Sequence, residues 1–442
     1  MKTMKYIALM AALFGLSSCL FETKYTVGGT VTGLRGLGLV LEDNSRNALT
    51  VGANGAFTFG TGVANGNTYS VTVRTQPSNP TQTCTVHNGA GTIAKASISN
   101  VMVSCTKAGQ FAYVANEAAN TISAYVINSS TGALAAIAGS PFGSNGTGPI
   151  AVAVDPNGNY LYVANSGSHN LSVYAIGSTG ALSPAGIAIA TGGGPAALAI
   201  DPTDHYLYVA NSTDNTVSAF AIGTGTNSAL VTAISGSPFA VGREPAALKT
   251  GPNGKFLYVT NLTDGTVTVL AIAPGTGALT PISGSPFAAG SGAVSIAIDP
   301  AGTFAYVANA AATTLAAYSI NASTGALTTA AGSPLSSGSS AESLVVNPAG
   351  SMVYAANVTS NNEIAAYAIT PSTGELTLRT SVSAGTFPVA IAMDPLGHFV
   401  FAANFTSGNV SVFNVNATTG ALTTVAGSPF AAGSNARSIA ID

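Results

Sequence analysis

Charge is scarce in this sequence of 442 residues. Charged side chains make up 7% of the chain, against about 25% in an ordinary soluble domain, whereas hydrophobic residues make up 47%. This composition excludes a charged disordered chain and a coiled coil, and the 51 glycines lack the three-residue period of collagen. The formal net charge of −3 provides no positive field for a nucleic-acid backbone, so we expect no nucleic-acid partner.

The sequence also lacks the short motifs of common enzyme and metal sites. It has no CxxC pair, no HExxH motif, no phosphate-binding glycine loop with a following lysine and no recognisable Ser-His-Asp set. The histidines lie in separate segments without the spacing of metal ligands, at His87, His169, His205 and His398. We therefore expect no metal and no other cofactor, and the sequence assigns no catalytic residue.

Long hydrophobic runs are missing as well, because no stretch beyond the N-terminus reaches the roughly 18 consecutive apolar residues of a membrane span. The N-terminus itself has two lysines followed by an apolar stretch from Tyr6 to Leu16, which is typical of a signal peptide. The next residues, Leu16-Ser17-Ser18-Cys19, resemble the lipobox of bacterial lipoproteins.

The lipobox resemblance implies a signal peptide over residues 1–18, lipid attachment at Cys19 and a tether over residues 19–23. Leu20 is not the Asp associated with inner-membrane retention, so the resemblance favours the outer membrane or the cell surface. The lipid anchor would then be the contact with the membrane. The alternative is an ordinary secretory signal in which Cys19 is incidental.

Cysteine is rare, with three residues in the chain. If Cys19 carries lipid, Cys84 and Cys105 remain as a pair, 21 positions apart. An exported protein meets an oxidising compartment, so we predict a disulfide between them, with two free buried thiols as the alternative.

Short strands are predicted over residues 24–107. Runs such as TYSVTVRT alternate between polar and apolar residues and are separated by turn clusters, without any helical period. This pattern predicts a small β-sandwich domain. The stretch resembles the immunoglobulin-like modules that follow the lipid anchor of bacterial surface proteins, which implies a spacer.

An internal repeat begins at Gln110. Its marker, aromatic-x-Ala/Thr-Asn, starts at Tyr113, Tyr162, Tyr208, Tyr258, Tyr306, Tyr354 and Phe401. The spacing of 46 to 50 residues fits four short strands and their turns, which is the size of a propeller blade. The sequence therefore predicts an all-β fold in which residues 108–442 form a seven-bladed β-propeller.

The two ends of the repeat are complementary. The first copy lacks an inner strand, whereas residues 438–442 consist of that strand alone. We expect this C-terminal strand to complete the first blade and close the ring. An outer-membrane β-barrel is the alternative, but it needs about 9–11 residues per strand, more than these runs supply.

The YVAN and DPxG repeats resemble the YVTN and lactonase-like seven-bladed β-propellers over residues 110–442. That family includes 6-phosphogluconolactonases and muconate-cycloisomerising enzymes, beside many surface proteins without assigned activity. Its enzymes tend to carry a Pro-His pair at the start of an inner strand. Here the corresponding prolines are followed by Ile150, Ala196, Ala246 and Val389. His169 and Asp214 are interpreted as loop residues rather than catalytic bases.

Acidic residues recur at the turn after five of the seven inner strands, at Asp155, Asp201, Asp299, Asp394 and Asp442, while Gly251 and Asn347 occupy the same place in the other two copies. A ring of metal ligands is one interpretation. Asp before Pro also starts turns, because its carboxylate accepts nearby backbone N–H groups, and we favour this structural role.

Four other ionisable residues interrupt the neutral repeat next to inner strands, namely Arg243, Glu244, Glu342 and Arg437. Such residues approach the central opening, where they would orient a polar ligand. The alternative is dispersed surface charge. Acidic residues outnumber basic ones in the repeat, which argues against a phosphorylated lactone as the substrate.

Two functions remain. The favoured one is a monomeric, lipid-anchored cell-envelope propeller that binds a protein, glycan or small molecule and is not an enzyme. The alternative is an exported lactonase-like hydrolase or isomerase, in which Arg243 polarises an oxygen and Glu244 or Glu342 handles a proton. The enzyme requires these ionisable residues to share one cavity, so scattered positions would contradict it.

Overall fold

A computed structural model describes residues 23–34, 38–77, 82–107, 111–223, 231–358 and 362–442. The regular structure of these residues is entirely β. The chain divides into two compact units, Met1–Thr106 and Lys107–Asp442. The proposed signal peptide and Cys19 lie outside the described residues. No helix among the described residues is long and apolar enough to cross a membrane.

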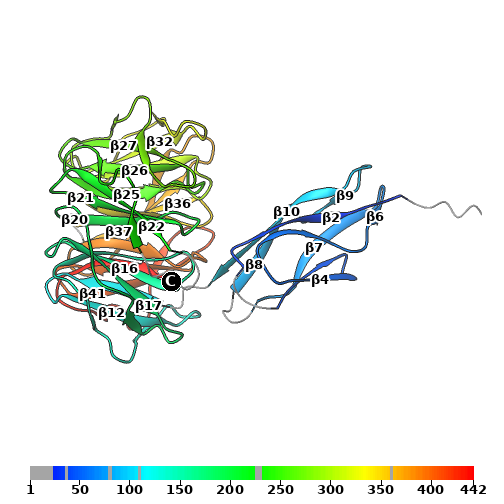
Figure 1. Cartoon of the computed structure of the whole chain (residues 1–442), viewed down its shortest axis with the longest axis horizontal. Coiled ribbons are helices and arrows are strands. Elements are labelled where there is room, and N and C mark those ends of the chain that lie inside the picture. The colour runs from blue at the N-terminus through cyan, green and yellow to red at the C-terminus, as the bar shows by residue number, and fades with distance from the viewer. Residues whose placement is uncertain (1–22, 35–37, 78–81, 108–110, 224–230, 359–361) are drawn as a thin grey trace, which may run out of the picture. The chain divides into compact units, whose positions relative to one another are not determined.

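The N-terminal unit contains two four-stranded sheets, ordered β5-β2-β10-β8 and β4-β3-β7-β9, and a short β1-β6 pair (Figure 1). Its strands are β1 (Lys24–Tyr25), β2 (Val27–Thr32), β3 (Leu39–Asp43), β4 (Asn47–Val51), β5 (Gly55–Thr58), β6 (Val63–Ala64), β7 (Thr68–Thr75), β8 (Gln82–His87), β9 (Ala90–Thr92) and β10 (Ile98–Lys107). Apolar side chains from both sheets form one core, including Val31, Leu41, Val71 and Val103. The predicted β-sandwich is confirmed.

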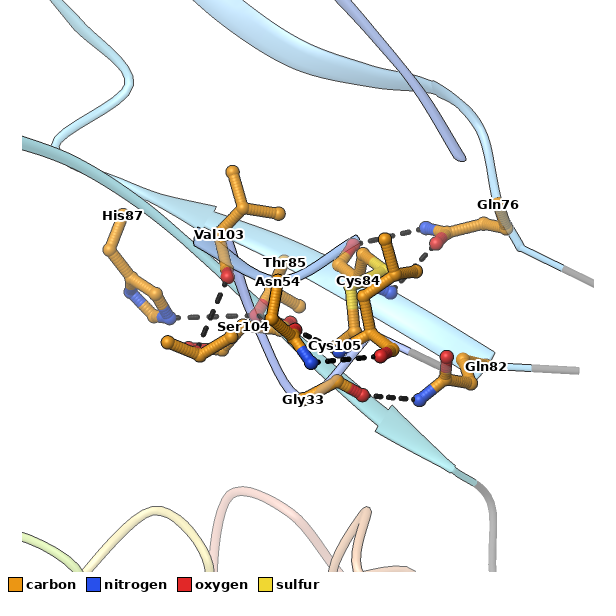
Figure 2. Close-up of a disulfide and its surroundings, with 12 residues drawn as sticks. Gly33, Asn54, Gln76, Gln82, Cys84, Thr85, His87, Val103, Ser104 and Cys105 are labelled. Atoms are coloured by element: carbon orange, nitrogen blue, oxygen red, sulfur yellow. Dashed lines mark hydrogen bonds between the residues drawn. A yellow bond between two sulfur atoms is a disulfide. The ribbon is translucent and has the colours of Figure 1, made fainter. Parts of the chain in front are cut away.

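The predicted disulfide is present in this unit. Cys84 on β8 is bonded to Cys105 on the neighbouring strand β10 (Figure 2). The side-chain amide of Gln76 completes the hydrogen bonding of Cys84, because it accepts the Cys84 N–H at 2.7 Å and donates to the Cys84 carbonyl at 3.0 Å. β8 is the last strand of its sheet, so these two hydrogen bonds with Gln76 take the place of pairing with a further strand at Cys84.

The C-terminal unit consists of seven antiparallel sheets, each with four main strands. The main strands of each blade are given from the innermost to the outermost: in blade 1, β44 (Ala436–Ile441), β11 (Phe111–Asn116), β12 (Thr121–Ile127) and β13 (Leu134–Ala136); in blade 2, β15 (Pro149–Val154), β16 (Tyr160–Asn165), β17 (Asn170–Ile176) and β18 (Leu182–Pro184). The next three blades contain, in blade 3, β20 (Pro195–Ile200), β21 (Tyr206–Asn211), β22 (Thr216–Ile222) and β23 (Val231–Ala233); in blade 4, β25 (Pro245–Thr250), β26 (Phe256–Asn261), β27 (Thr266–Ile272) and β28 (Leu279–Pro281); in blade 5, β30 (Ala293–Ile298), β31 (Phe304–Asn309), β32 (Thr314–Ile320) and β33 (Leu327–Thr329). The last two contain, in blade 6, β35 (Ala341–Val346), β36 (Met352–Asn357), β37 (Glu363–Ile369) and β38 (Leu376–Ser383); and in blade 7, β39 (Pro388–Met393), β40 (Phe399–Asn404), β41 (Asn409–Val415) and β42 (Leu422–Thr424). The predicted seven-bladed propeller is confirmed.

Six blades carry an additional short strand that pairs with the third strand. These strands are β14 (Phe142–Gly143), β19 (Ile189–Ala190), β24 (Phe239–Ala240), β29 (Phe287–Ala288), β34 (Leu335–Ser336) and β43 (Phe430–Ala431). The Gly-Ser-Pro element precedes five of them. Its serine hydroxyl accepts a backbone N–H of the third strand, as Ser140 does from Ala124 at 2.9 Å, and its Ser–Pro bond is cis.

The C-terminal strand closes the ring as predicted. β44 pairs antiparallel with β11, with Val114 opposite Ile439 and Ala112 opposite Ile441. Inner strands of consecutive blades are neighbours all the way round, including β39 with β44 and β44 with β15. The first blade is therefore built from both ends of the repeat.

The aromatic-x-Ala/Thr-Asn marker that recurs in each copy packs the second strand of the blade into the core. The second strands of all seven blades are almost wholly buried, and their final Asn is 0% exposed in every case. In blade 4, the amide of Asn261 donates to the hydroxyls of Thr266 and Thr268, both at 2.9 Å. A Cβ on Gly242 would lie 2.5 Å from this amide, so the connection into the inner strand passes directly over it.

The recurrent aspartates are turn residues, as interpreted from the sequence. The Asp155 carboxylate accepts the N–H groups of Asn159 and Tyr160 at 2.6 and 2.8 Å. Asp299 accepts the corresponding pair in blade 5, and Asn347 does so in blade 6. Because an amide serves as well as a carboxylate here, the position has a structural role.

Candidate functional site

A β-bulge at the start of every inner strand builds the candidate site. In each blade the first residue of the inner strand lies opposite the buried Asn of the second strand, and the register then shifts by one residue. The bulged residues are Ile150, Ala196, Ala246, Val294, Glu342, Val389 and Arg437. Bulges redirect side chains and are common beside active sites.

All seven bulged residues line a single cavity of about 370 Å³, which we call the inner-strand cavity. Five of the seven are apolar, and the two exceptions are Glu342 in blade 6 and Arg437 in blade 1. Glu244, one residue before the inner strand of blade 4, also contributes to the lining. Three of the four ionisable residues singled out from the sequence therefore lie around one cavity.

Arg243 is the exception. It is not among the residues that line the inner-strand cavity, and its side chain is 70% exposed. Its Nε lies 2.6 Å from one carboxylate oxygen of Asp264, and its backbone N–H donates to the other at 2.7 Å. These contacts hold the pKa of Asp264 below its ordinary value. The role expected for Arg243 in polarising an oxygen is not available at this position.

The sequence did not predict this pairing. Asp264 lies in the turn after the second strand of blade 4, and its contact with Arg243 depends on how that turn folds. Asp214 has the corresponding place in blade 3, where its carboxylate accepts the N–H of Gly193 at 2.6 Å. In both blades, the carboxylate in the turn after the second strand accepts a backbone N–H from the segment that leads into the inner strand. The interpretation of Asp214 as a loop residue agrees with this contact.

Glu244 has an unusual backbone conformation. Six of the seven residues that directly precede an inner strand have left-handed φ angles between 56° and 76°, namely Gly148, Gly194, Glu244, Gly292, Phe387 and Asn435. Glycine and asparagine adopt this conformation readily, whereas Glu and Phe do so at a cost. The strain is therefore concentrated at Glu244, which lines the inner-strand cavity, and at Phe387, which does not line it. Backbone strain of this kind is typical of functional positions.

Contacts fix the Glu244 side chain and backbone. The Thr263 hydroxyl donates to its carboxylate at 2.5 Å, and its N–H donates to the Asn215 side chain at 2.7 Å. The same N–H contact recurs in blade 3, where Gly194 donates to Nδ1 of His169 at 3.0 Å. His169 therefore replaces an asparagine in the repeat, a structural role that the sequence did not predict.

Arg437 is positioned by groups from two blades. Its Nε lies 3.9 Å from a carboxylate oxygen of Glu117, and its guanidinium lies 5.5 Å from the centre of the Phe405 ring. Phe405 in turn contacts Phe387, with 6.2 Å between ring centres. A guanidinium held over an aromatic ring keeps its orientation.

Glu342 comes from the strand itself, so its backbone is fixed by the blade. The hydroxyl of Ser340 donates to its carboxylate at 3.2 Å. Serines at the next position of the inner strands brace the cavity wall across blades: Ser295 accepts the N–H of Leu344, and Ser343 accepts that of Ile391. These serines were missed from the sequence, where they do not differ from the many other serines.

The cavity combines an apolar ring with one guanidinium and two carboxylates. Such a lining suits a small, polar, uncharged molecule, whose oxygens bind the charged groups and whose carbon atoms contact the apolar wall. Among the described residues, no group of three or more His, Cys, Asp or Glu side chains is placed to hold a metal ion. The ionisable groups that line this cavity are the carboxylates of Glu244 and Glu342 and the guanidinium of Arg437.

Known structures share this fold. A putative 6-phosphogluconolactonase from Bacteroides fragilis matches with a TM-score of 0.66 and 19% identity, over 75% of this chain and 97% of the other. The periplasmic gluconolactonase of Pseudomonas aeruginosa matches with a TM-score of 0.61 and 18% identity, over 74% of this chain and 97% of its own. These similarities concern the fold. No curated protein matches the chain in sequence.

A family description covers most of the chain more directly. Residues 102–242 and 243–436 match the lactonase family described as a seven-bladed β-propeller. The match spans the whole propeller apart from its final residues, and it agrees with the resemblance carried by the YVAN and DPxG repeats. The chain therefore belongs to the lactonase family of seven-bladed β-propellers.

Proposed function

We propose that this protein hydrolyses a lactone in the inner-strand cavity. The observation that carries the proposal is that Glu342, Glu244 and Arg437, from three blades, all line one cavity of a lactonase-family propeller. Family membership and a shared cavity support this alternative better than the binding module favoured from the sequence. A dispersed surface charge would have supported the binding module.

In the proposed reaction, a water molecule attacks the carbonyl carbon of the lactone. Glu342 accepts a proton from that water as general base, because its carboxylate is the one held on a bulged inner-strand position. The Arg437 guanidinium stabilises the negative charge that develops on the carbonyl oxygen. The ring C–O bond then breaks, the proton passes from Glu342 to the departing oxygen, and a hydroxy acid leaves.

Glu244 is proposed to bind the substrate. It lies on blade 4, across the ring from blade 1, and Thr263 fixes its carboxylate. A carboxylate accepts hydrogen bonds from hydroxyl groups, which suits a polyhydroxylated lactone. A phosphorylated lactone is disfavoured, since the lining sets two carboxylates against a single guanidinium that is already near Glu117.

The location of the reaction is part of the same proposal. A lipid anchor at Cys19 would place the propeller in the cell envelope, where it meets lactones from outside the cytoplasm. Globomycin treatment of cells, followed by the mass of the N-terminal peptide, tests this point. A peptide that begins at an unmodified residue other than Cys19 would contradict the anchor.

Activity is tested on the full chain by following acid release from a panel of lactones, with and without phosphate, above the spontaneous rate. We expect Glu342→Gln and Arg437→Gln each to lower kcat/KM by about 100-fold or more. Arg243→Gln is the matched control, because Arg243 carries the same charge as Arg437 but lies outside the cavity. Absence of turnover on every lactone, or equal loss in all three variants, would overturn the proposal.

A further inference from the structure

Blade 6 differs from the other blades at its outer edge. Its outer strand β38 runs unbroken over Leu376–Ser383, whereas each of the other blades, as far as the structure describes them, divides this edge between a three-residue and a two-residue strand. The register between β38 and β37 shifts between Leu378 and Thr380, so Arg379 is the extra residue of a β-bulge. Because a bulge redirects the side chain that it carries, the direction of Arg379 is set by a feature particular to this blade.

The second strand of blade 6 also departs from the repeat, at its first residue. This residue is Met352, whereas the other six blades have an aromatic residue there, namely Phe111, Tyr160, Tyr206, Phe256, Phe304 and Phe399. In blade 5 the Phe304 ring lies directly against Gly374 in the outer turn of the next blade, and Met352 lies in the same way against Gly420 of blade 7. A flexible thioether therefore replaces a ring at this one junction between blades.

Both departures line a single cavity of about 560 Å³, which we call the outer-edge cavity. The remaining lining comes from Ser351, Ala368 and Thr380 of blade 6 and from residues 417–421, the turn between β41 and β42 of blade 7. None of these residues lines the inner-strand cavity. The outer-edge cavity is therefore a second site, between the outer parts of two neighbouring blades.

The lining of the outer-edge cavity holds one charged group, the guanidinium of Arg379, beside several hydroxyl groups. With the residues that the structure describes, this guanidinium forms neither an ion pair nor a hydrogen bond. The Ser351 hydroxyl accepts from the Asn347 amide at 3.1 Å, and the Thr419 hydroxyl accepts the Ala421 N–H at 3.3 Å. Each of these hydroxyls still has its own proton to donate, so the cavity offers donors for an anion.

A structural role for Arg379 would be to keep another chain from pairing with β38, since charge on an exposed edge strand discourages such pairing. Arg379 is exposed, which is all that this role requires. The role does not account for the bulge, for Met352 or for the cavity that the two residues share.

We propose that the outer-edge cavity binds a small organic acid with a flat apolar body, such as an aromatic carboxylate. The Arg379 guanidinium pairs with the carboxylate through two parallel N–H donors, and the hydroxyls of Ser351 and Thr419 donate to its oxygens. The apolar body packs on Met352, because a thioether makes favourable contacts with aromatic rings. The ligand thus supplies the ring that the protein itself provides at this position in the other blades.

Benzoate is the probe, added to the full chain at constant ionic strength and followed by saturation-transfer NMR and by the heat of binding. We expect saturable binding, at least about 10-fold tighter than that of acetate, phosphate or benzamide, because acetate and phosphate lack the ring and benzamide lacks the charge. Acetate or phosphate binding as tightly as benzoate would overturn the apolar part of the proposal, and equal binding of benzamide would overturn the role of the guanidinium.

Two variants assign the binding to the outer-edge cavity. Arg379→Met should weaken benzoate binding by at least about 10-fold. Met352→Phe keeps the guanidinium and restores the residue type of the other blades, so it should fold and should also weaken binding by filling the cavity. Lys255→Met is the matched control, because it removes a charge from an exposed lysine in the turn after β25.

Benzoate affinity that is unchanged in both Arg379→Met and Met352→Phe, or no binding to the wild-type chain, would overturn the proposal. Neither measurement involves lactone hydrolysis, and both variants should hydrolyse lactones at the wild-type rate. A failure of this proposal is therefore distinguishable from a failure of the proposed hydrolysis.

Discussion

Glu342 and Arg437 occupy the same structural position in two different blades. Each is the bulged residue that follows the first residue of an inner strand, and each lines the inner-strand cavity. Blade 7, with Val389 at this position, lies between them. A carboxylate and a guanidinium are thus presented by the same kind of bulge on an otherwise apolar ring, and this relationship underlies the proposed activity.

Closure of the ring by β44 predicts a strong effect of its buried side chains. Ile439 is 7% exposed in a core shared by blades 1 and 7. We expect Ile439→Ala to cost about 2–5 kcal/mol of unfolding free energy. Ile187→Ala is the matched control, since Ile187 is 89% exposed and should cost almost nothing. Equal denaturation midpoints for the two variants would contradict the closure.

The disulfide predicts a local effect on stability. Removing it with a Cys84→Ala/Cys105→Ala variant should destabilise the N-terminal unit by about 3 kcal/mol, because 21 positions separate the two cysteines and the loop is released in the unfolded state. Unfolding followed by calorimetry should show a lower transition for that unit alone. A shift of the propeller transition by the same amount would be inconsistent with two separate cores.

Asp204 predicts a dependence of stability on pH. Burial and the nearby charge of Asp155 raise the pKa of Asp204 to about 7. The folded state therefore holds a proton that the unfolded state, with an ordinary Asp pKa of about 3.9, has already lost. Propeller stability should fall as pH rises from about 4 to about 7, and the Asp204→Asn variant should lose this slope. An unchanged slope in the variant would contradict the assignment.

The contact between His169 and Gly194 predicts which substitutions the turn tolerates. His169→Asn keeps an acceptor for the Gly194 N–H, as asparagines do in blades 2, 4 and 7. It should therefore leave stability nearly unchanged, whereas His169→Ala should cost about 1 kcal/mol. Neither variant should change lactone hydrolysis. A large loss of kcat in both would instead make His169 part of the active site.

The repeat, the blade count and the closure could all be predicted from the sequence, because they depend on patterns that recur in every blade. The spacing of the Tyr113 and Tyr162 markers fixes one blade, and the strand ending at Asp442 matches the one that the first copy lacks. Glu342 and Arg437 were also recognisable, since they break a neutral pattern at a defined distance from the marker.

Other features depend on contacts that the pattern does not contain. Arg243 has the same sequence context as Glu244, but its partner Asp264 lies on a turn that the sequence places only approximately. The bulge that directs position two of each inner strand toward the cavity has no sequence signature here.

The repeated bulge has a consequence for how this scaffold changes over time. A bulged residue has no cross-strand partner of its own, so its side chain can be exchanged with little effect on the sheet that carries it. Seven such positions face one another on a constant frame. Single substitutions at Ala196 or Val294, for example, would supply a new acid, base or hydroxyl, so one gene could be adapted to a new ligand without rebuilding its blades.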